Sequence, residues 1–312
     1  MGASDRIKQI IEWRTRRGRV GIEYLVPTLI GDFRSQWEAN PVEEFCDFIP
    51  IRLVTFIEVF TREWVRAIVD HGQPYITRAE KLVKNEKIDF LFSMEIQNRR
   101  VSLGDLVAHA VSVSGVTQIL SIFGTLIEDF VVKISAVHDR WEVEVEGKEK
   151  RPIISDLQGT LKTLDNLFSI RHILTHEYPR HKPFDIAQIG RFFDATSQLI
   201  SAAEEIAELE IKGVTPLTQT DMNITSYANL QKLTKDLEDH INKVSSLSDI
   251  NSELLAESQD AWEKFTEADA RLYASLAAGG TMEPMLFADR KAELTSQRLE
   301  HLRWWLERES EF

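Results

Sequence analysis

The chain has 312 residues and 43% hydrophobic content, which is ordinary for a globular protein and leaves length for two domains. Its formal net charge of −13 argues against a protein that coats nucleic acid by bulk electrostatics, so any RNA would bind at a local basic cluster. Because Cys46 is the only cysteine, intramolecular disulfides and sites built from several thiolates are excluded.

The first residues contain no apolar stretch of signal-peptide type, so we expect no leader and a cytoplasmic protein. The uncharged run from Leu106 to Ile127 is interrupted by many polar residues, which is atypical of a membrane span. We interpret it as buried helices broken near Gly115, and we predict no membrane partner.

Hydrophobic residues recur with a helical period along nearly the whole chain, and no run alternates convincingly as a strand, which predicts an all-α protein. In the first two-thirds of the chain, helices are expected over residues 51–70, from 103, over 116–137, over 153–176 and over 184–212. Ser102 is expected to cap the helix that begins at residue 103. The charged residues 138–151 are expected to form a solvated connector.

The best linker in the chain is Gly213 to Pro216, which combines a glycine with a proline. Three long polar helices are expected after it, over residues 219–246, 249–277 and 285–308. We therefore predict a helical-bundle domain over residues 1–212, with its core at about 45–210, and a small three-helix domain over residues 217–312.

The most informative run is Arg-His-Ile-Leu-Thr-His-Glu-Tyr at residues 171–178, just before Pro179. A guanidinium can hold a phosphate through two parallel hydrogen bonds, and an imidazole can exchange a proton near neutral pH, so Arg171 and His176 can cleave RNA without a metal. At about 100° per residue these two side chains lie roughly 140° apart around a helix. Two copies packed side by side would aim both at one phosphate, which predicts a homodimer with a composite site.

Further polar residues are candidates for supporting roles. A polar stripe is expected on this helix, at spacings of four, three and four, from Asp165, Ser169, His172 and His176. Asp165 and Ser169 are expected to support the imidazoles. Glu58 and Glu128, each expected on a core helix, are candidates to face the same cleft, although ion pairing within the bundle is the plainer interpretation of both.

Two basic clusters stand out against the acidic chain. Arg180 and Lys182, close to the His-containing run, are predicted to contact RNA. The cluster from Arg14 to Arg19 is more typical of a solvated basic turn than of an RNA groove, although the neighbouring Trp13 could stack on a base.

Less specific interpretations of the same residues remain open. Arg171 and His176 could be ordinary polar residues of a bundle, because a short pattern recurs by chance and a second match lies at Arg66 to His71. His172 and His176 could also form half of a metal site, with His181 as the nearest third ligand. We predict neither a metal nor another cofactor.

The pattern Arg-x4-His-x-Tyr near the end of a helix in an all-α domain resembles the HEPN superfamily. The stretches IPIRLVTFIEVFTREWVRAIVDHG and VSLGDLVAHAVSVSGVTQILSIFGTLIEDF are similar to the preceding core helices of bacterial members. The resemblance covers about residues 45–210. It implies a metal-independent endoribonuclease that produces a 2′,3′-cyclic phosphate at a site shared between two protomers.

Carried over residue by residue, the resemblance gives Arg171 and His176 the catalytic roles, and His172 the polar position after the arginine. Tyr178 matches a tyrosine that a partner antitoxin modifies in some HEPN toxins, so it is a regulatory candidate. A toxin or antiphage defence effector is implied, with an antitoxin or a phage-derived trigger as a further partner.

Three stretches after the linker, TQTDMNITSYANLQKLTKDLEDHINKV, LAESQDAWEKFTEADARLYA and GGTMEPMLFADRKAELTSQRLEHL, resemble the three helices of the N-terminal domain of the lysozyme inhibitor LprI. Relatives are usually exported and carry cysteines, where this chain has Thr225, Ala270 and Arg290. The absence of disulfides fits a cytosolic sensing, docking or regulatory module. The helical pattern places Trp262, Phe265, Leu272 and Tyr273 in its core, and leaves at least one of Trp304 and Trp305 partly exposed.

The leading hypothesis is therefore an RNA-cleaving HEPN effector with an appended recognition domain. The main alternative is a non-catalytic HEPN protein that binds nucleotides or RNA or serves as a scaffold. A third class, a lysozyme-interacting protein of the cell envelope, would require export.

Overall fold

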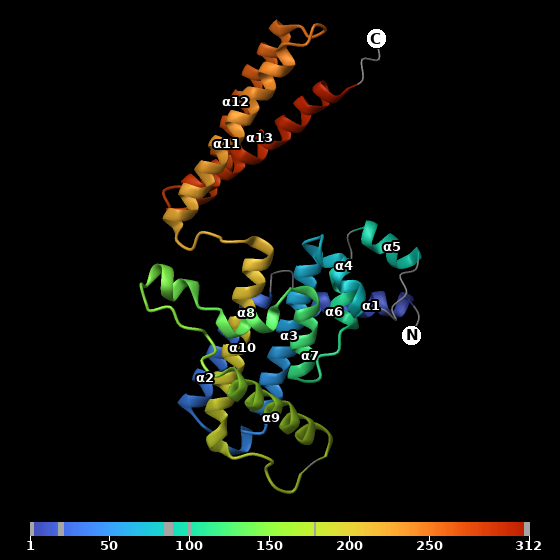
Figure 1. Ribbon diagram of the computed structural model, residues 1–312, viewed down its shortest axis with the longest axis vertical. Helices are drawn as coiled ribbons and strands as arrows, with labels where there is room; N and C mark the ends of the chain where they lie inside the picture. The colour runs from blue at the N-terminus through green and yellow to red at the C-terminus, as the bar shows by residue number, and fades with distance from the viewer. Residues whose placement is uncertain (1–2, 18–21, 84–89, 99–100, 178, 309–312) are drawn as a thin grey trace. The chain divides into compact units, whose positions relative to one another are not determined.

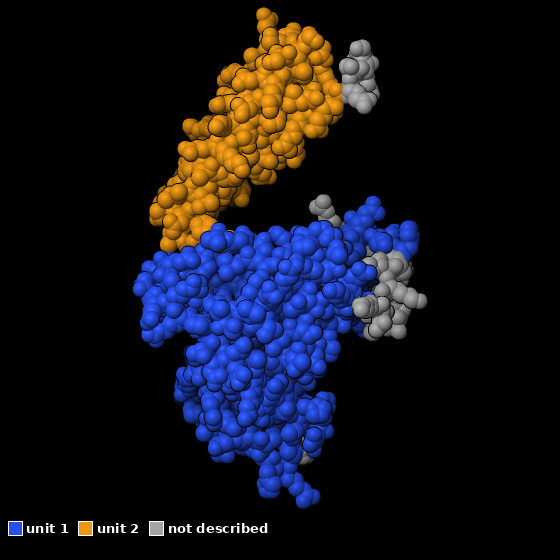
Figure 2. Space-filling model, viewed as in Figure 1, with its two compact units in different colours: residues 1–214 blue, residues 215–312 orange. Residues whose placement is uncertain are grey.

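The computed structural model describes residues 3–17, 22–83, 90–98, 101–177 and 179–308 (Figure 1). Within these ranges the secondary structure is helical and no strand occurs, which confirms the predicted all-α class. The chain divides into two compact units, unit 1 over residues 1–214 and unit 2 over residues 215–312 (Figure 2).

The helices of unit 1 include the one that carries Arg171, His172 and His176. They are α1 (Ala3–Arg17), α2 (Ile22–Ala39), α3 (Phe48–Asp70), α4 (Tyr75–Ala79), α5 (Phe90–Gln97), α6 (Leu103–Ala110), α7 (Val116–Leu126), α8 (Phe130–Ala136), α9 (Leu157–His176) and α10 (Ile189–Lys212). Unit 2 consists of α11 (Gln219–Ser245), α12 (Ser252–Ala274) and α13 (Glu283–Glu307).

Helix α3 is the central helix of unit 1, with α2, α6, α7, α9 and α10 packed around it (Figure 1). Its apolar residues fall at helical spacing, and Val54, Ile57, Phe60, Trp64 and Ile68 are all buried, while Ile51 at its start is partly buried. Each fully buried side chain of this size contributes roughly 1.5–3 kcal/mol of transfer free energy. The hydrophobic stripe of α3 therefore anchors the unit.

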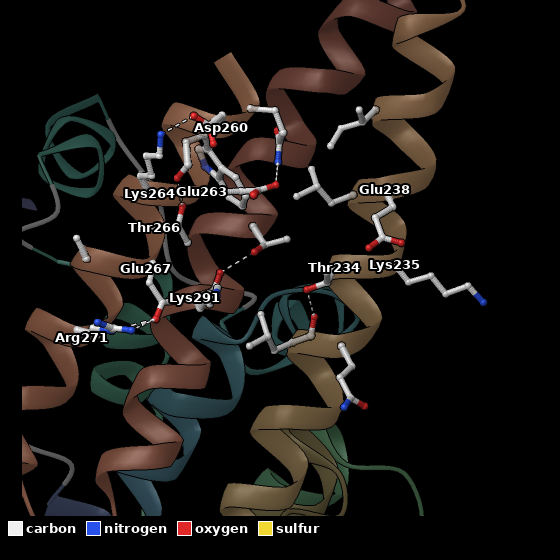
Figure 3. A pocket seen from close by; sticks show the side chains of 18 residues that line it. Thr234, Lys235, Glu238, Asp260, Glu263, Lys264, Thr266, Glu267, Arg271 and Lys291 are labelled. Carbon is white, nitrogen blue, oxygen red and sulfur yellow. Dashed lines mark hydrogen bonds and ion pairs between the residues drawn. The ribbon is translucent and has the colours of Figure 1, made fainter. Parts of the chain in front are cut away.

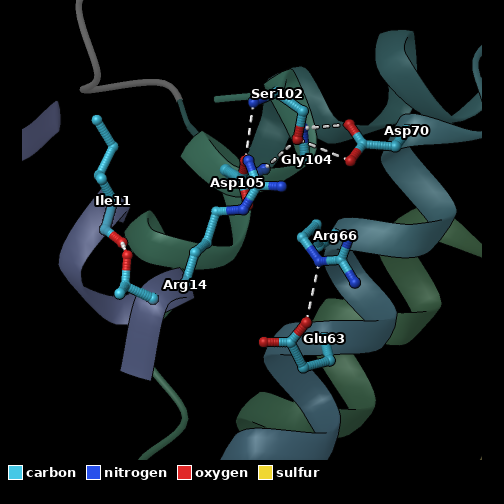
Figure 4. A network of polar contacts seen from close by, with 9 residues as sticks. Ile11, Arg14, Glu63, Arg66, Asp70, Ser102, Gly104 and Asp105 are labelled. Carbon is cyan, nitrogen blue, oxygen red and sulfur yellow. Dashed lines mark hydrogen bonds and ion pairs between the residues drawn. The ribbon is translucent and has the colours of Figure 1, made fainter. Parts of the chain in front are cut away.

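A polar network joins α3 to α6 (Figure 4). Ser102 caps α6 as predicted, within a capping box completed by Asp105. Asp70 of α3 accepts hydrogen bonds from the Ser102 hydroxyl (2.7 Å) and the Gly104 amide (2.8 Å). A Cβ on Gly104 would lie 2.3 Å from the Arg66 carbonyl oxygen, so only glycine permits this close approach of the two helices.

The same network holds α1 against α6. The Arg14 guanidinium donates to the carboxylate of Asp105 at 2.9 Å, as Figure 4 shows. Close by, Ile7 and Ile10 of α1 are buried with Val101 and Leu106 in a small satellite core. Polar and apolar contacts together therefore fix the position of α1.

The helix predicted over residues 116–137 is two helices, so that part of the prediction is wrong. Helix α7 ends at Leu126, Ile127 is buried in an extended conformation, and Asp129 adopts a left-handed conformation with φ 55°. Aspartate tolerates this region better than most residues because its short polar side chain bonds locally. Glu128 therefore lies in a turn and not on a core helix.

In unit 2, α13 packs against both α11 and α12, and Leu237, Val244, Leu299 and Leu302 form the main buried cluster. Helix α12 contributes Thr266, Ala270 and Ala274, whose small side chains let it approach α13 closely. The expectation of a core built from Phe265, Leu272 and Tyr273 is wrong, because these side chains are 55%, 71% and 43% exposed. Trp262 is partly buried, and Trp304 and Trp305 are both exposed.

Among the described residues, no helix combines the length and the hydropathy that crossing a membrane requires.

Candidate functional site

Arg171, His172 and His176 lie in the C-terminal half of α9. Asp156 caps the start of α9 by accepting a hydrogen bond from the Gly159 amide (3.0 Å). The helix then buries Leu164, Leu167 and Ile170 in the core of the unit. Because these residues occupy the inner face, His172 and His176 lie on the outer face and are exposed.

Arg171 and Glu58 are brought together by the packing of α9 on α3. The Nη2 atom of Arg171 donates to Oε1 of Glu58 at 3.0 Å, with the two side chains 34% and 19% exposed. Nη1 of Arg62 lies 3.6 Å from Oε2 of the same carboxylate. Two guanidiniums thus share one carboxylate, which leaves a formal charge of +1 at this point of an acidic chain.

Arg62 was not among the residues singled out from the sequence. The signal available was its position four residues after Glu58, which places the two side chains on one helix face. Arg62 belongs to the site because Arg171 contacts the same carboxylate of Glu58. That contact depends on the packing of α9 against α3, which the sequence does not show.

The imidazoles of His172 and His176 lie side by side, with ring centroids 4.9 Å apart and planes inclined by 49°. Both are exposed at the end of α9. Arg171 turns instead toward α3, as its ion pair with Glu58 shows. Within one copy of the chain, Arg171 is thus directed toward α3 while His176 is exposed, which agrees with their expected separation around the helix.

The other predicted supporting residues lie as follows. Asp165 is exposed on α9, and its backbone carbonyl accepts a hydrogen bond from the Ser169 hydroxyl (2.9 Å). Glu128 is 77% exposed in its turn and forms an ion pair with Arg78. Arg78 lies on α4, whereas Arg171 lies on α9. Tyr178 falls outside the described residues.

Of the two basic residues predicted to contact RNA, Arg180 is exposed and Lys182 is held by the protein. The Lys182 ammonium donates to the Glu43 carbonyl (3.0 Å) and to Sγ of the buried Cys46 (2.9 Å), and lies 3.6 Å from Asp47. The hydrogen bond with Cys46 raises the pKa of Lys182. These contacts tie the segment after α9 to the residues just before α3.

A metal site at His172 and His176 lacks a third ligand in this structure. Within the part of the chain that the structure describes, no group of three or more His, Cys, Asp or Glu side chains is arranged to hold a metal ion.

Unit 2 has a groove of about 980 Å³ between α11 and α12, and Lys291 and Thr295 of α13 contribute to its lining (Figure 3). Apolar side chains, including Trp262 and Leu237, line part of it. Glu267 accepts hydrogen bonds from Lys291 (2.8 Å) and Arg271 (3.0 Å), and Figure 3 shows both cations converging on its carboxylate. The hydrogen bond from Lys291 is the main cause that lowers the pKa of Glu267.

Comparison with known proteins identifies a relative for unit 2. Residues 214–302 match the family described as Lysozyme inhibitor LprI, which confirms that part of the sequence-based resemblance. No HEPN family match was found, so the HEPN resemblance rests on the motif and the helix pattern alone. No curated protein and no solved structure matches the chain.

Proposed function

We propose that unit 1 is a metal-independent endoribonuclease of the HEPN type that cuts RNA at the Arg171–His176 site. The observation that supports this most directly is the combination, at one end of α9, of a partly exposed guanidinium held by Glu58 and two adjacent exposed imidazoles. Such a set supplies phosphate binding and proton transfer, the two requirements for cutting RNA by its own 2′-hydroxyl.

In the proposed reaction Arg171 binds the scissile phosphate and stabilises the charge that develops on its oxygens. His176 takes the proton of the 2′-hydroxyl as that oxygen attacks phosphorus. The bond from phosphorus to the 5′-oxygen breaks, and we assign the proton for the leaving oxygen to His172, whose ring centroid lies 4.9 Å from that of His176. The products are a 2′,3′-cyclic phosphate and a 5′-hydroxyl end.

We propose that the complete site forms in a homodimer. Arg171 faces α3 and His176 faces outward from the same helix, so one copy presents them in different directions. A second α9 packed beside the first brings the arginine of one copy to the imidazole of the other. Tyr178 follows His176 by two residues in the sequence, and we propose it as the position of a modification that regulates the site.

We place this activity in the cytoplasm, with RNA as substrate, and interpret the protein as a toxin or antiphage effector. Unit 2 is then a sensing or docking module that responds to an antitoxin or to a phage-derived trigger. The alternative for unit 1 is a non-catalytic HEPN domain that binds RNA or nucleotides.

A second candidate function follows from the family match of residues 214–302. The family is described as a lysozyme inhibitor, and unit 2 presents an open groove between α11 and α12. Inhibition of lysozyme by the purified protein, lost when Trp262 in the groove is replaced, would support this function. Undiminished lysozyme activity at saturating protein would exclude it.

The test of the nuclease is cleavage of a mixed-sequence RNA and a tRNA pool in EDTA. Arg171→Ala and His176→Ala are expected to lower the rate by about 10²-fold or more, a typical loss for a phosphate-binding or proton-transferring group. His301→Ala, which removes an exposed imidazole from α13, is the matched control and should leave the rate unchanged.

End-group analysis should find 2′,3′-cyclic phosphates. Absence of cleavage by a folded dimer would contradict the proposal. RNA binding that is unaffected by His176→Ala, with no cutting, would favour the non-catalytic alternative.

A further inference from the structure

Unit 1 has a hollow, outside the residues assigned above to RNA cleavage, where α1, α3 and α6 meet. We call it the Trp13 hollow. It measures about 450 Å³ and is lined by Gln9, Glu12, Trp13, Arg16, Arg62 and His109. This volume lies within the range of small-molecule sites, and each lining side chain is polar, charged or aromatic. Such a lining suits a flat ring system that carries hydrogen-bonding groups and is attached to negative charge.

The shape of the Trp13 hollow is set by contacts that do not involve a ligand. Arg14, next to Trp13 in the chain, bonds to the buried carboxylate of Asp105 at 2.9 Å. Ile10, one turn before, is fully buried. The Trp13 ring meets His109 of α6 edge to face, with centroids 6.5 Å apart. The indole is therefore oriented in advance, which lowers the entropy cost of binding a ring against it.

Arg62 lies between the Trp13 hollow and the ion pair of Arg171 with Glu58. It lines the hollow, and its Nη1 atom lies 3.6 Å from the Glu58 carboxylate that holds Arg171. Glu58 and Arg62 are four residues apart on α3, a rise of about 6 Å. The two sites are thus separated by a single carboxylate.

The charge of the lining favours an anionic ligand. Arg16, Arg62 and the adjoining Arg171 contribute three positive charges, and Glu12 and Glu58 contribute two negative charges. The balance is positive, whereas the whole chain carries −13. A polyanion repelled by most of the surface is therefore attracted to this hollow and to the adjoining Arg171.

We propose that the Trp13 hollow is a nucleobase subsite, which holds the base of a nucleotide next to the phosphate bound by Arg171. The proposal rests on the proposed nuclease function for the phosphate, and on the geometry of the hollow for the base. The base stacks on the indole of Trp13, and the guanidinium of Arg62 or Arg16 lies beside it, as arginines do in single-strand binding sites. Because a base must leave its helix to enter, the ligand is single-stranded RNA.

The experiment measures binding of a labelled, fully 2′-O-methylated oligoribonucleotide to the full chain in EDTA. This probe has no free 2′-hydroxyl and is not cut. A probe of the same length and charge, abasic at every position, measures phosphate binding alone. Trp13→Ala is expected to weaken binding of the base-containing probe by about fivefold or more, since stacking of one base contributes roughly 1–3 kcal/mol. Binding of the abasic probe should not change.

Two further variants keep the test decisive, because Trp13 also packs against the core of unit 1. Trp13→Phe preserves an aromatic face and should retain most of the binding of the base-containing probe. Trp141→Ala removes an exposed indole from the connector between α8 and α9 and should leave both probes unaffected. Equal loss of both probes in Trp13→Ala, with Trp13→Phe folded and equally impaired, overturns the subsite. So does unchanged binding of the base-containing probe in Trp13→Ala.

The two proposals fail in different ways. Cleavage that requires Arg171, together with probe binding that ignores Trp13, overturns the subsite and leaves the nuclease. Base-dependent binding that requires Trp13, without cleavage of natural RNA, supports the subsite and removes the nuclease.

Discussion

Glu58 on α3 and Arg171 on α9 are 113 residues apart in the chain and are joined by an ion pair of 3.0 Å. Arg62 approaches the other oxygen of the same carboxylate. Glu58 therefore holds the guanidinium of Arg171 in place and offsets half of the positive charge that the two arginines bring. This relationship determines how strongly the site attracts a phosphate.

Replacement of Glu58 by glutamine should strengthen RNA binding. Glu58→Gln raises the formal charge around Arg62 and Arg171 from +1 to +2, so affinity should rise several-fold and depend more steeply on salt, by about one unit of log–log slope. Fluorescence anisotropy with an uncleavable RNA over a range of salt concentrations measures both. Glu300→Gln, an exposed change on α13, is the control. An unchanged salt slope in Glu58→Gln would place the bound phosphate elsewhere.

The ion pair itself should contribute little to stability. Because Arg171 is about one-third exposed, a double-mutant cycle of Glu58→Gln and Arg171→Met should give a coupling free energy of roughly 0.2–1 kcal/mol, as for other partly exposed pairs. Urea unfolding of the four proteins measures it. A coupling of several kcal/mol would mean that the pair is structural and that its arginine is not available to a ligand.

Gly104→Ala should destabilise unit 1. The added Cβ would meet the Arg66 carbonyl oxygen at 2.3 Å and the Asp70 side chain at 2.7 Å, so α3 and α6 would have to separate. The expected cost is about 1–3 kcal/mol, typical of overpacking. Gly124→Ala on α7 is a matched control, because its Cβ would enter open space. The measurement is urea denaturation, and equal midpoints for the two variants would show that the helices yield freely.

The pH dependence of stability should change in Asp70→Asn. Burial is the main cause that raises the pKa of Asp70 above its ordinary value of 3.8. The folded state therefore holds this proton more tightly, and the free energy of unfolding falls as the pH rises from that value through the folded pKa. Asparagine lacks this titration, so the variant should gain stability relative to the wild type as the pH rises above 3.8 through the folded pKa. Urea unfolding at several pH values measures it, and parallel curves would contradict the expectation.

Glu267 in unit 2 should show the opposite sign. Its pKa lies below the ordinary value of 4.5, chiefly because Lys291 donates a hydrogen bond to the carboxylate. The resulting stability is present above that value and is lost as the pH falls through the folded pKa. Glu267→Gln should lack this loss. Hydrogen exchange of the α12 and α13 amides across the acid range measures it, and identical acid responses would refute the role of the Lys291 contact.

Local features of the chain could be predicted because they depend on neighbours in the sequence. The apolar stripe of α3 and the Ser102 cap of α6 follow from helical spacing and from the side chain that a cap requires. The break after Leu126 could not be predicted, because residues 127–129 include no helix-stopping glycine or proline and Gly124 lies inside α7. The burial of Ile127 in an extended conformation creates that break.

By itself the sequence determined the all-α class, the LprI-like character of the C-terminal unit and the clustering of Arg171, His172 and His176 at one end of a helix. Only the tertiary structure decided which side chains meet. It paired Arg171 with Glu58 and left Phe265 exposed on α12. The physical reason is that helical period and capping act over a few residues. Pairing and burial, in contrast, depend on which faces of distant helices pack together, and no local pattern specifies that choice.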